Sequence, residues 1–244
     1  GAGLYVTSGV NVTVTGAASL AELAAIDAAN GSGSLTYGSV SDAVLGLVAD
    51  AALNGGAGLY VVSGIAVTVT DAASIGQLVT IDAVAGAVSA TSITDSASNL
   101  FPGGVLSGYV TSGVNVTVTD AATLAQLLAI DAANGGGALV CTAVSDTASA
   151  LAADASTNSG AGTYVVAGVA VTVTDAATLT QLAAIDAANG GGALNYTSVS
   201  DTAANLAADA ATNGGAGTYV ASGIGVTVTD AVSVAQLSAI DAAN

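Results

Sequence analysis

The sequence predicts an α/β repeat protein, a β/α solenoid of strand–helix units of about 27 residues that alternate within five repeats of about 55 residues. Three observations predict this fold class. A tyrosine and an Ile-Asp-Ala motif recur along the chain in matching steps. Each repeat contains β-branched runs that are followed by helix-start signals. The apolar residues are mostly alanine and valine, so the core must be thin, and a stack of repeats suits a thin core.

The repeat boundaries follow from the recurring residues. Five tyrosines open equivalent segments with steps of 55, 49, 55 and 55 residues: Tyr5, Tyr60, Tyr109, Tyr164 and Tyr219. The aspartate of the Ile-Asp-Ala motif follows the same steps: Asp27, Asp82, Asp131, Asp186 and Asp241. The repeats are therefore residues 1–55, 56–104, 105–159 and 160–214, with a half repeat at 215–244. The second repeat is shortened near Phe101 and Pro102.

The first half of each repeat, here called a first-half unit, begins with a strand pattern. In the fourth copy the run Val171-Thr-Val-Thr174 alternates apolar and polar residues, which is typical of a strand with one buried face. The pair Ala167-Gly168, which is Ser-Gly in the other copies, interrupts the β-branched run before it. We expect a tight turn or a bulge there.

A helix follows, and its start is marked by a capping box in all five copies. A Ser or Thr stands three residues before a Glu or Gln, so that each side chain can bond to the backbone of the other residue. The pairs are Ser19/Glu22, Ser74/Gln77, Thr123/Gln126, Thr178/Gln181 and Ser233/Gln236. Leu179, Leu182 and Ile185 form an apolar stripe at helical spacing, and Asn189-Gly190 predicts a left-handed stop.

The second half of each repeat, here called a second-half unit, follows a weaker version of the same scheme. Residues 193–200 predict a strand, and Asp201 is the expected N-cap of a helix over 202–212 that ends at Asn213-Gly214. The same pattern surrounds Asp42, Asp95 and Asp146. One unit of this size cannot bury its own apolar face, whereas stacked neighbours can, which favours the solenoid. The alternative is a row of tandem small α/β domains, each with its own sheet.

The charge excludes several function classes. The chain has no Lys, Arg or His, and 17 Asp and Glu give a formal net charge of −17. We expect no nucleic-acid partner, because phosphate contacts need cations, and no binding to anionic membranes. No membrane insertion is expected either, since the longest uncharged stretch contains Pro102 and several glycines. We expect no enzyme, because no imidazole or amine is present to activate a nucleophile such as Cys141.

Aspartates stand at the strand-to-helix turn of successive units: Asp42, Asp71, Asp95, Asp120, Asp146, Asp175, Asp201 and Asp230. If the strands form a ladder with a spacing of ~4.8 Å, like charges stack and repel by about 3 to 4 kcal/mol at an effective dielectric of 20. Either the helix N-termini absorb this charge, or Ca²⁺ bridges the carboxylates and turn carbonyls. The second alternative makes Ca²⁺ the one expected cofactor, with candidate ligands Asp71, Asp95, Asp120, Asp146, Asp175, Asp201 and Asp230.

Two further sets of polar residues carry expectations. The Ile-Asp-Ala aspartates lie near helix C-termini, where the dipole disfavours a negative charge, so we expect them to face solvent or an intermolecular partner. Outward Thr-x-Thr pairs recur in the first-half strands: Thr13/Thr15, Thr68/Thr70, Thr117/Thr119, Thr172/Thr174 and Thr227/Thr229. A flat array of this kind resembles the ice-binding face of β-solenoid antifreeze proteins. The alternative is that threonine is a good strand residue on a solvated face.

Segments such as VTVTDAATLTQLAAIDAANGGGA and SVSDTAANLAADAATNGGAGTY resemble the Ala/Thr/Asp-rich tandem repeats of giant bacterial secreted surface proteins, including adhesins exported by type I secretion. The resemblance implies an extracellular or cell-surface location and often calcium. The chain departs from that group's calcium-binding motif, because Gly135-Gly-Gly137 and Gly190-Gly-Gly192 lack the following Asp.

We expect a structural subunit of an extracellular filament, sheath or surface layer that assembles head to tail with itself. The ends of the chain fall inside the repeat, and we expect both to expose apolar stacking faces. The alternative is the stalk of a calcium-stabilised bacterial adhesin.

Overall fold

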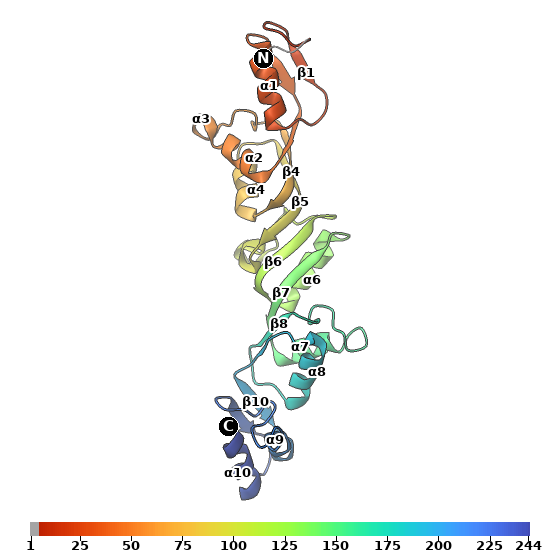
Figure 1. Cartoon of the computed structure of the whole chain (residues 1–244), viewed down its shortest axis with the longest axis vertical. Coiled ribbons are helices and arrows are strands. Elements are labelled where there is room, and N and C mark those ends of the chain that lie inside the picture. The colour runs from red at the N-terminus through yellow and green to blue at the C-terminus, as the bar shows by residue number, and fades with distance from the viewer. Residues whose placement is uncertain (1–4) are drawn as a thin grey trace. The chain divides into compact units, whose positions relative to one another are not determined.

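The computed structural model describes residues 5–244 and shows an α/β fold in which strands alternate with helices along the chain (Figure 1). The chain divides into two compact parts. One comprises the residues up to 117 together with 129–140, and the other comprises 118–128 together with 141–244.

The strands are short, and those that pair run parallel. Seven form one sheet in the order β3-β4-β5-β6-β7-β8-β9, while β1-β2 and β10-β11 form two-stranded sheets. Their bounds are β1 Val12–Val14, β2 Leu35–Tyr37, β3 Ser39–Asp42, β4 Ala66–Ala73, β5 Ala87–Asp95, β6 Asn115–Ala122, β7 Leu139–Asp146, β8 Ala170–Val173, β9 Leu194–Asn195, β10 Ser198–Asp201 and β11 Gly225–Val228.

The helices connect the strands, and each expected unit contains at least one. Their bounds are α1 Leu20–Asn30, α2 Val44–Ala51, α3 Leu53–Gly56, α4 Ile75–Asp82, α5 Ala97–Leu100, α6 Leu124–Asn134, α7 Ala148–Ala155, α8 Leu179–Asn189, α9 Ala203–Ala210 and α10 Val234–Ala243, with a 3₁₀ turn at Pro102–Gly104. The shortened second repeat contains the four-residue helix α5 and this 3₁₀ turn. No helix within residues 5–244 has the length and apolarity that crossing a membrane requires.

Each strand pairs with a strand of an adjacent unit along the chain. Ser39 of β3 stands beside Ala66 of β4, and Ser198 of β10 stands beside Gly225 of β11. Where β9 stops short, an isolated bridge from Ala177 to Val199 continues the pairing. The main-chain polar groups of one unit are thus satisfied by its neighbour, as in any parallel sheet.

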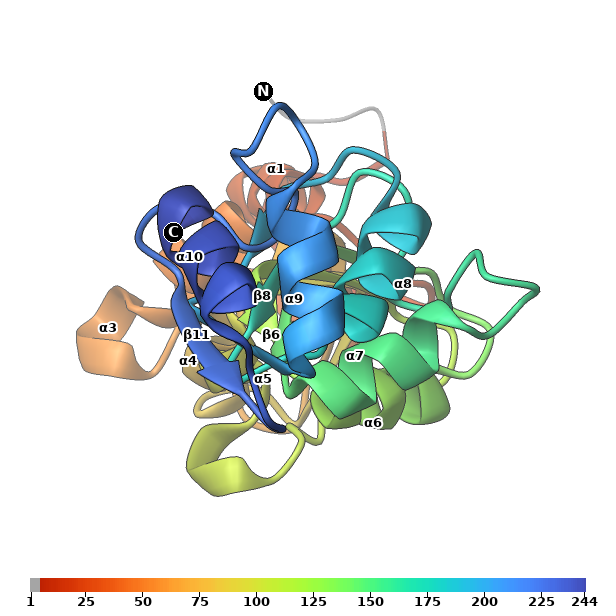
Figure 2. The ribbon, with the colours of Figure 1, turned by 90° about the horizontal axis from the view of Figure 1, so that it is seen from below.

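The core is a set of small apolar side chains that recurs in every repeat. In the second repeat Val67 and Val69 of β4 and Leu78 and Ile81 of α4 are all buried. The equivalent helix leucines Leu23, Leu127 and Leu182 are fully buried too. Neighbouring helices pack against one another, as α9 and α10 do in Figure 2.

The predicted capping boxes are confirmed in all five first-half helices. In each, the backbone N–H of the Glu or Gln donates to the Ser or Thr hydroxyl, and the Ser or Thr N–H donates back to that Glu or Gln. The left-handed stop is also confirmed, because Gly190 has φ 54° at the end of α8. Gly192 beside it must be glycine for another reason: a Cβ there would collide with the backbone carbonyl of Val169.

The prediction for the second-half helices was wrong at their starts. Asp201 is not the N-cap of α9, because the N-cap is Thr202, whose hydroxyl accepts from the backbone N–H of Asn205. In the same way Thr147 caps α7 and Ser96 caps α5, each one residue after the expected aspartate. These aspartates remain the last residues of their strands and bond elsewhere.

Candidate functional site

The strand-end aspartates of the second-half units cap the helix of the preceding unit. One carboxylate oxygen of Asp201 accepts from the backbone N–H of Leu179, the first residue of α8, at 3.0 Å. Its other oxygen accepts from the N–H of Thr202 and the side-chain amide of Asn205, both at 2.8 Å. The same cross-unit bond joins Asp42 to Leu20, Asp95 to Ile75 and Asp146 to Leu124. A carboxylate at this place also meets the positive end of the helix dipole.

The equivalent aspartates of the first-half units also accept from the first helix N–H of the preceding unit. Asp71 accepts from the backbone N–H of Val44 at 2.7 Å, Asp175 from that of Ala148 at 2.6 Å, and Asp230 from that of Ala203 at 2.6 Å. Asp120 also has an interaction partner. The first-half unit of the first repeat differs, because Gly16 stands where the other copies have this aspartate.

Backbone N–H groups therefore stabilise these carboxylates and offset the repulsion expected between stacked charges. Burial opposes the ionisation of Asp201, but the bonds from Asn205, Thr202 and Leu179 outweigh it and lower the pKa of the carboxyl below its usual 3.8. The seven candidate calcium ligands are spread over successive units. Asp95, Asp146 and Asp201 end their strands, and Asp175 and Asp230 follow theirs, whereas Asp71 and Asp120 lie within β4 and β6 and not at a turn. Among the described residues, no group of three or more acidic, histidine or cysteine side chains is arranged to hold a metal ion.

A second set of aspartates organises the loops that follow the second-half helices. One oxygen of Asp209 accepts from three consecutive backbone N–H groups, those of Thr218, Tyr219 and Val220, at 3.1, 2.9 and 2.7 Å. Asp154 and Asp50 bind residues 163–165 and 59–61 in the same way. These three aspartates were not among the site residues predicted from the sequence. Their signal is a fixed spacing, since each stands ten residues before a repeat-opening tyrosine.

Asp27, Asp82 and Asp186 are solvent-exposed, as expected of the Ile-Asp-Ala aspartates, and each also accepts a hydrogen bond from a tyrosine of the next repeat in the same chain. The hydroxyl of Tyr109 donates to Asp82 at 2.8 Å, and that of Tyr219 donates to Asp186 at 3.3 Å. Tyr60 makes the same contact with Asp27 at 3.4 Å. Burial, together with the nearby carboxylate, raises the pKa of Tyr109 and of Tyr219 to about 12.

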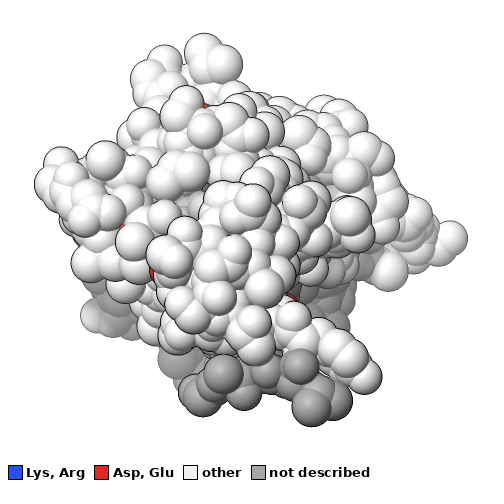
Figure 3. All heavy atoms as spheres, turned by 90° about the horizontal axis from the view of Figure 1, so that it is seen from above, with Lys and Arg blue, Asp and Glu red and all other residues white. Residues whose placement is uncertain are grey.

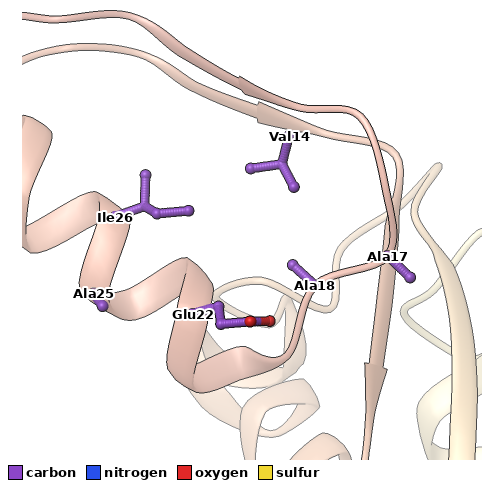
Figure 4. A pocket seen from close by; sticks show the side chains of 6 residues that line it. All are labelled: Val14, Ala17, Ala18, Glu22, Ala25 and Ile26. Atoms are coloured by element: carbon purple, nitrogen blue, oxygen red, sulfur yellow. The ribbon is translucent and has the colours of Figure 1, made fainter. Parts of the chain in front are cut away.

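Two faces of the molecule leave apolar side chains without a covering unit. Between β1 and α1 lies an open pocket of about 350 Å³ that is lined by Val14, Ala17, Ala18, Glu22, Ala25 and Ile26 (Figure 4). Seen from the side of β1 and α1, the surface shows only traces of carboxylate (Figure 3). The other face is formed by β11 and α10, where Val234, Leu237, Ser238 and Asp241 line a second open pocket.

The remaining candidate residues are the outward threonines and Cys141, and all of them lie on strands or next to them. The outward threonines lie on the solvent side of their strands, and Thr68 and Ser89 are hydrogen-bonded neighbours in register at 3.2 Å. Ice binding by this face stays a prediction. Cys141 lies half-buried on β7, and burial raises the pKa of its thiol, which disfavours the reactive thiolate.

Comparison of the chain with protein-family models, curated proteins and solved structures finds no match.

Proposed function

We propose that this chain is a structural protein, a β/α solenoid that serves as the building block of an extracellular filament, sheath or surface layer and joins other copies of itself end to end. The observation that carries the proposal is the exposure of stacking residues on two faces. Leu237 of α10 is 51 % exposed, whereas its equivalent Leu182 is fully buried. On the β1–α1 face Ile26 is half-buried, whereas its equivalent Ile81 is fully buried.

The energetics favour covering these faces. Full burial of an aliphatic side chain contributes roughly 1.5–3 kcal/mol. Several such side chains lie together on each face, so a second stack of the same cross-section can bury them as an internal neighbour does. Joining two unlike faces gives a heterologous contact that need not close, and the product is an open fibre.

The polar residues support a structural role over a catalytic one. The aspartates at the strand ends, in the loops and in the Ile-Asp-Ala motifs accept bonds that hold successive units together. The chain contains no Lys, Arg or His that could act as an acid, a base or an anion ligand. The extracellular setting rests on the resemblance to bacterial surface repeats.

Light scattering on the purified chain at rising concentration, with Ca²⁺ and moderate salt, tests the proposal. We expect the mass to grow with concentration and negative-stain images to show fibres. Val228→Asp, on the half-buried side of β11, should reduce assembly, whereas Thr227→Asp adds the same charge to the exposed side and should have little effect. A chain that stays monomeric under these conditions contradicts the building-block proposal.

The second candidate is the passive stalk of a calcium-stabilised bacterial adhesin. The observation that favours it is the formal net charge of −17 without a single cation, which divalent ions would offset. A stalk carries its binding domain elsewhere, so a long reading frame with a distinct domain beyond the repeats supports this candidate. It also predicts a monomer in solution.

A further inference from the structure

The face formed by β11 and α10 carries the features that another face of the chain uses for stacking. On α8, the first backbone N–H belongs to Leu179, the central leucine is Leu182 and the Ile-Asp-Ala carboxylate is Asp186. On α10 the same three places are held by Val234, Leu237 and Asp241, and the first and last of them are seven residues apart in both helices. The two helices therefore present the same set of groups at the same spacing.

The segment 190–220 covers the α8 set in the folded chain. Its Asp201 accepts from the backbone N–H of Leu179 at 3.0 Å, and its Tyr219 hydroxyl donates to Asp186 at 3.3 Å. Between these two polar contacts, α8 packs against β9 and β10 of the segment, and Leu182 is fully buried. Recognition is thus polar at both ends of the helix and apolar in the middle.

The α10 set is open at all three points. Val234 is 86 % exposed and Leu237 is 51 % exposed. Within residues 5–244, the N–H of Val234 meets no carboxylate, and Asp241 receives no tyrosine hydroxyl. Segment 190–220 contacts the equivalent three groups on α8. The β11–α10 face lacks these contacts, so it fits a segment of the same kind.

The β1–α1 unit of a second copy fits this face less well. Gly16 stands where the strand-end aspartate would be, so this unit brings no carboxylate to the N–H of Val234. Its tyrosine, Tyr5, also precedes the strand, whereas Tyr219 follows the unit that covers α8. A joint made through β1 and α1 buries Leu237 but leaves the two polar contacts unmade.

We propose that the β11–α10 face is a docking surface for a second-half unit of this repeat followed by its tyrosine, a partner with the chemistry of residues 190–220. The partner's strand-end carboxylate caps α10 at Val234, its strands cover Leu237, and its phenol donates to Asp241. The inference rests on the stacked architecture proposed above, and it specifies which kind of unit the face accepts.

A synthetic peptide of residues 190–220, titrated into the full 244-residue chain, tests the proposal by calorimetry. We expect saturable one-to-one binding. Asp201→Ala in the peptide should weaken binding about tenfold, since it leaves a helix N–H uncapped, and Tyr219→Phe should weaken it by about threefold or more. Leu237→Asp in the chain should abolish binding, whereas Val14→Asp, on the other open face, should leave it unchanged.

A fusion gives a second readout that does not depend on the peptide folding as it binds. Residues 190–220 are joined directly after Asn244, which holds the place of Asn189 at the helix end. Hydrogen exchange at the Val234 amide should slow at least tenfold, and the Asp201→Ala change in the added segment should reverse most of this protection. Unchanged exchange, or equal binding by the wild-type peptide and both variant peptides, overturns the inference.

The outcomes separate this inference from the proposed function. If the chain alone forms fibres but neither peptide nor fusion engages α10, the inference is wrong and end-to-end assembly stands. If the peptide binds and the chain alone remains monomeric, the docking surface stands and the homopolymer is wrong.

Discussion

The carboxylate of Asp201 accepts a hydrogen bond from the backbone N–H of Leu179, 22 residues earlier, so a strand of one unit caps the helix of the unit before it. Thr178 caps the same helix from its own unit through the capping box. The first turn of α8 is therefore held by two groups from different parts of the repeat.

Replacing Asp201 by Ala should lower the free energy of unfolding by about 1–3 kcal/mol, because a charge-assisted bond is lost and a helix N–H is left unpaired. Thr178→Ala should cost about 1 kcal/mol. Urea unfolding measures both. Asp241→Ala is the matched control, since this aspartate accepts no tyrosine hydroxyl within residues 5–244, and its change should stay within about 0.5 kcal/mol. Equal values for Asp201→Ala and Asp241→Ala would show that the cross-unit cap contributes nothing.

Acid should weaken the fold through the same residue. The pKa of Asp201 is lowered in the folded chain, so its contribution is fully present above the unfolded value of 3.8 and is lost as pH falls through the lower folded value. The stability difference between wild type and Asp201→Ala should therefore shrink as pH falls below 3.8. Urea midpoints measured from neutral pH into this range check it, and a constant difference would contradict it.

Alkali should weaken the tyrosine contacts. The pKa of Tyr109 and of Tyr219 is raised to about 12 from 10.0, so their contribution is intact below pH 10 and is lost as pH rises toward 12. Ultraviolet titration of tyrosinate should show these two rings ionising late. Asp186→Asn should lower the pKa of Tyr219 and leave that of Tyr109 unchanged, since Tyr109 donates to Asp82 instead. An identical titration curve for this variant would argue against the contact.

Calcium should raise the melting temperature more than NaCl of the same ionic strength, and chelation should reverse the gain. The reason is the net charge of −17, which no cation of the chain offsets. Differential scanning calorimetry with matched salts measures the effect. The same response to both salts would leave only screening and remove ordered calcium sites from consideration.

Gly16→Asp should strengthen self-association of the chain about five- to tenfold. The new carboxylate would stand where Asp71 and Asp175 stand in other copies, and in a joint between two molecules it could cap the α10 helix of the neighbour. A Cβ added at position 16 meets no atom within 4 Å, so the change should be tolerated. Gly38→Asp, at another open position of the same repeat, is the control for added charge. Sedimentation velocity across a concentration series separates the two variants, and equal association would refute the capping explanation.

Local signals were sufficient to predict the capping boxes, the Gly190 stop and the alternation of strands with helices, because each depends on residues within one turn or one strand. The hydrogen-bond partners of the aspartates could not be predicted from local signals. The hydrogen bond from the Leu179 N–H to the Asp201 carboxylate depends on the register of two strands and on the path of the chain between these two residues. The sequence placed Asp201 correctly at the strand end but attached it to the wrong helix, since the nearer helix already has Thr202 as its cap.

The Asp50, Asp154 and Asp209 loops show a different limit. These aspartates recur along the sequence as regularly as the strand-end aspartates do. They lie in helices, however, where an aspartate is usually interpreted as a solvent-exposed residue. Only the fold shows that three backbone N–H groups converge on each one.

Every strand-end aspartate whose cross-unit partner is known bonds to a main-chain N–H, and a main-chain N–H is present in any residue but proline. The hydrogen bond therefore does not depend on which side chain the donor residue carries. Whole units can also be deleted or duplicated by recombination within the gene, because any new neighbour supplies the same donor in the same place. A chain built in this way can change its length over evolution while each surviving unit keeps its bonds.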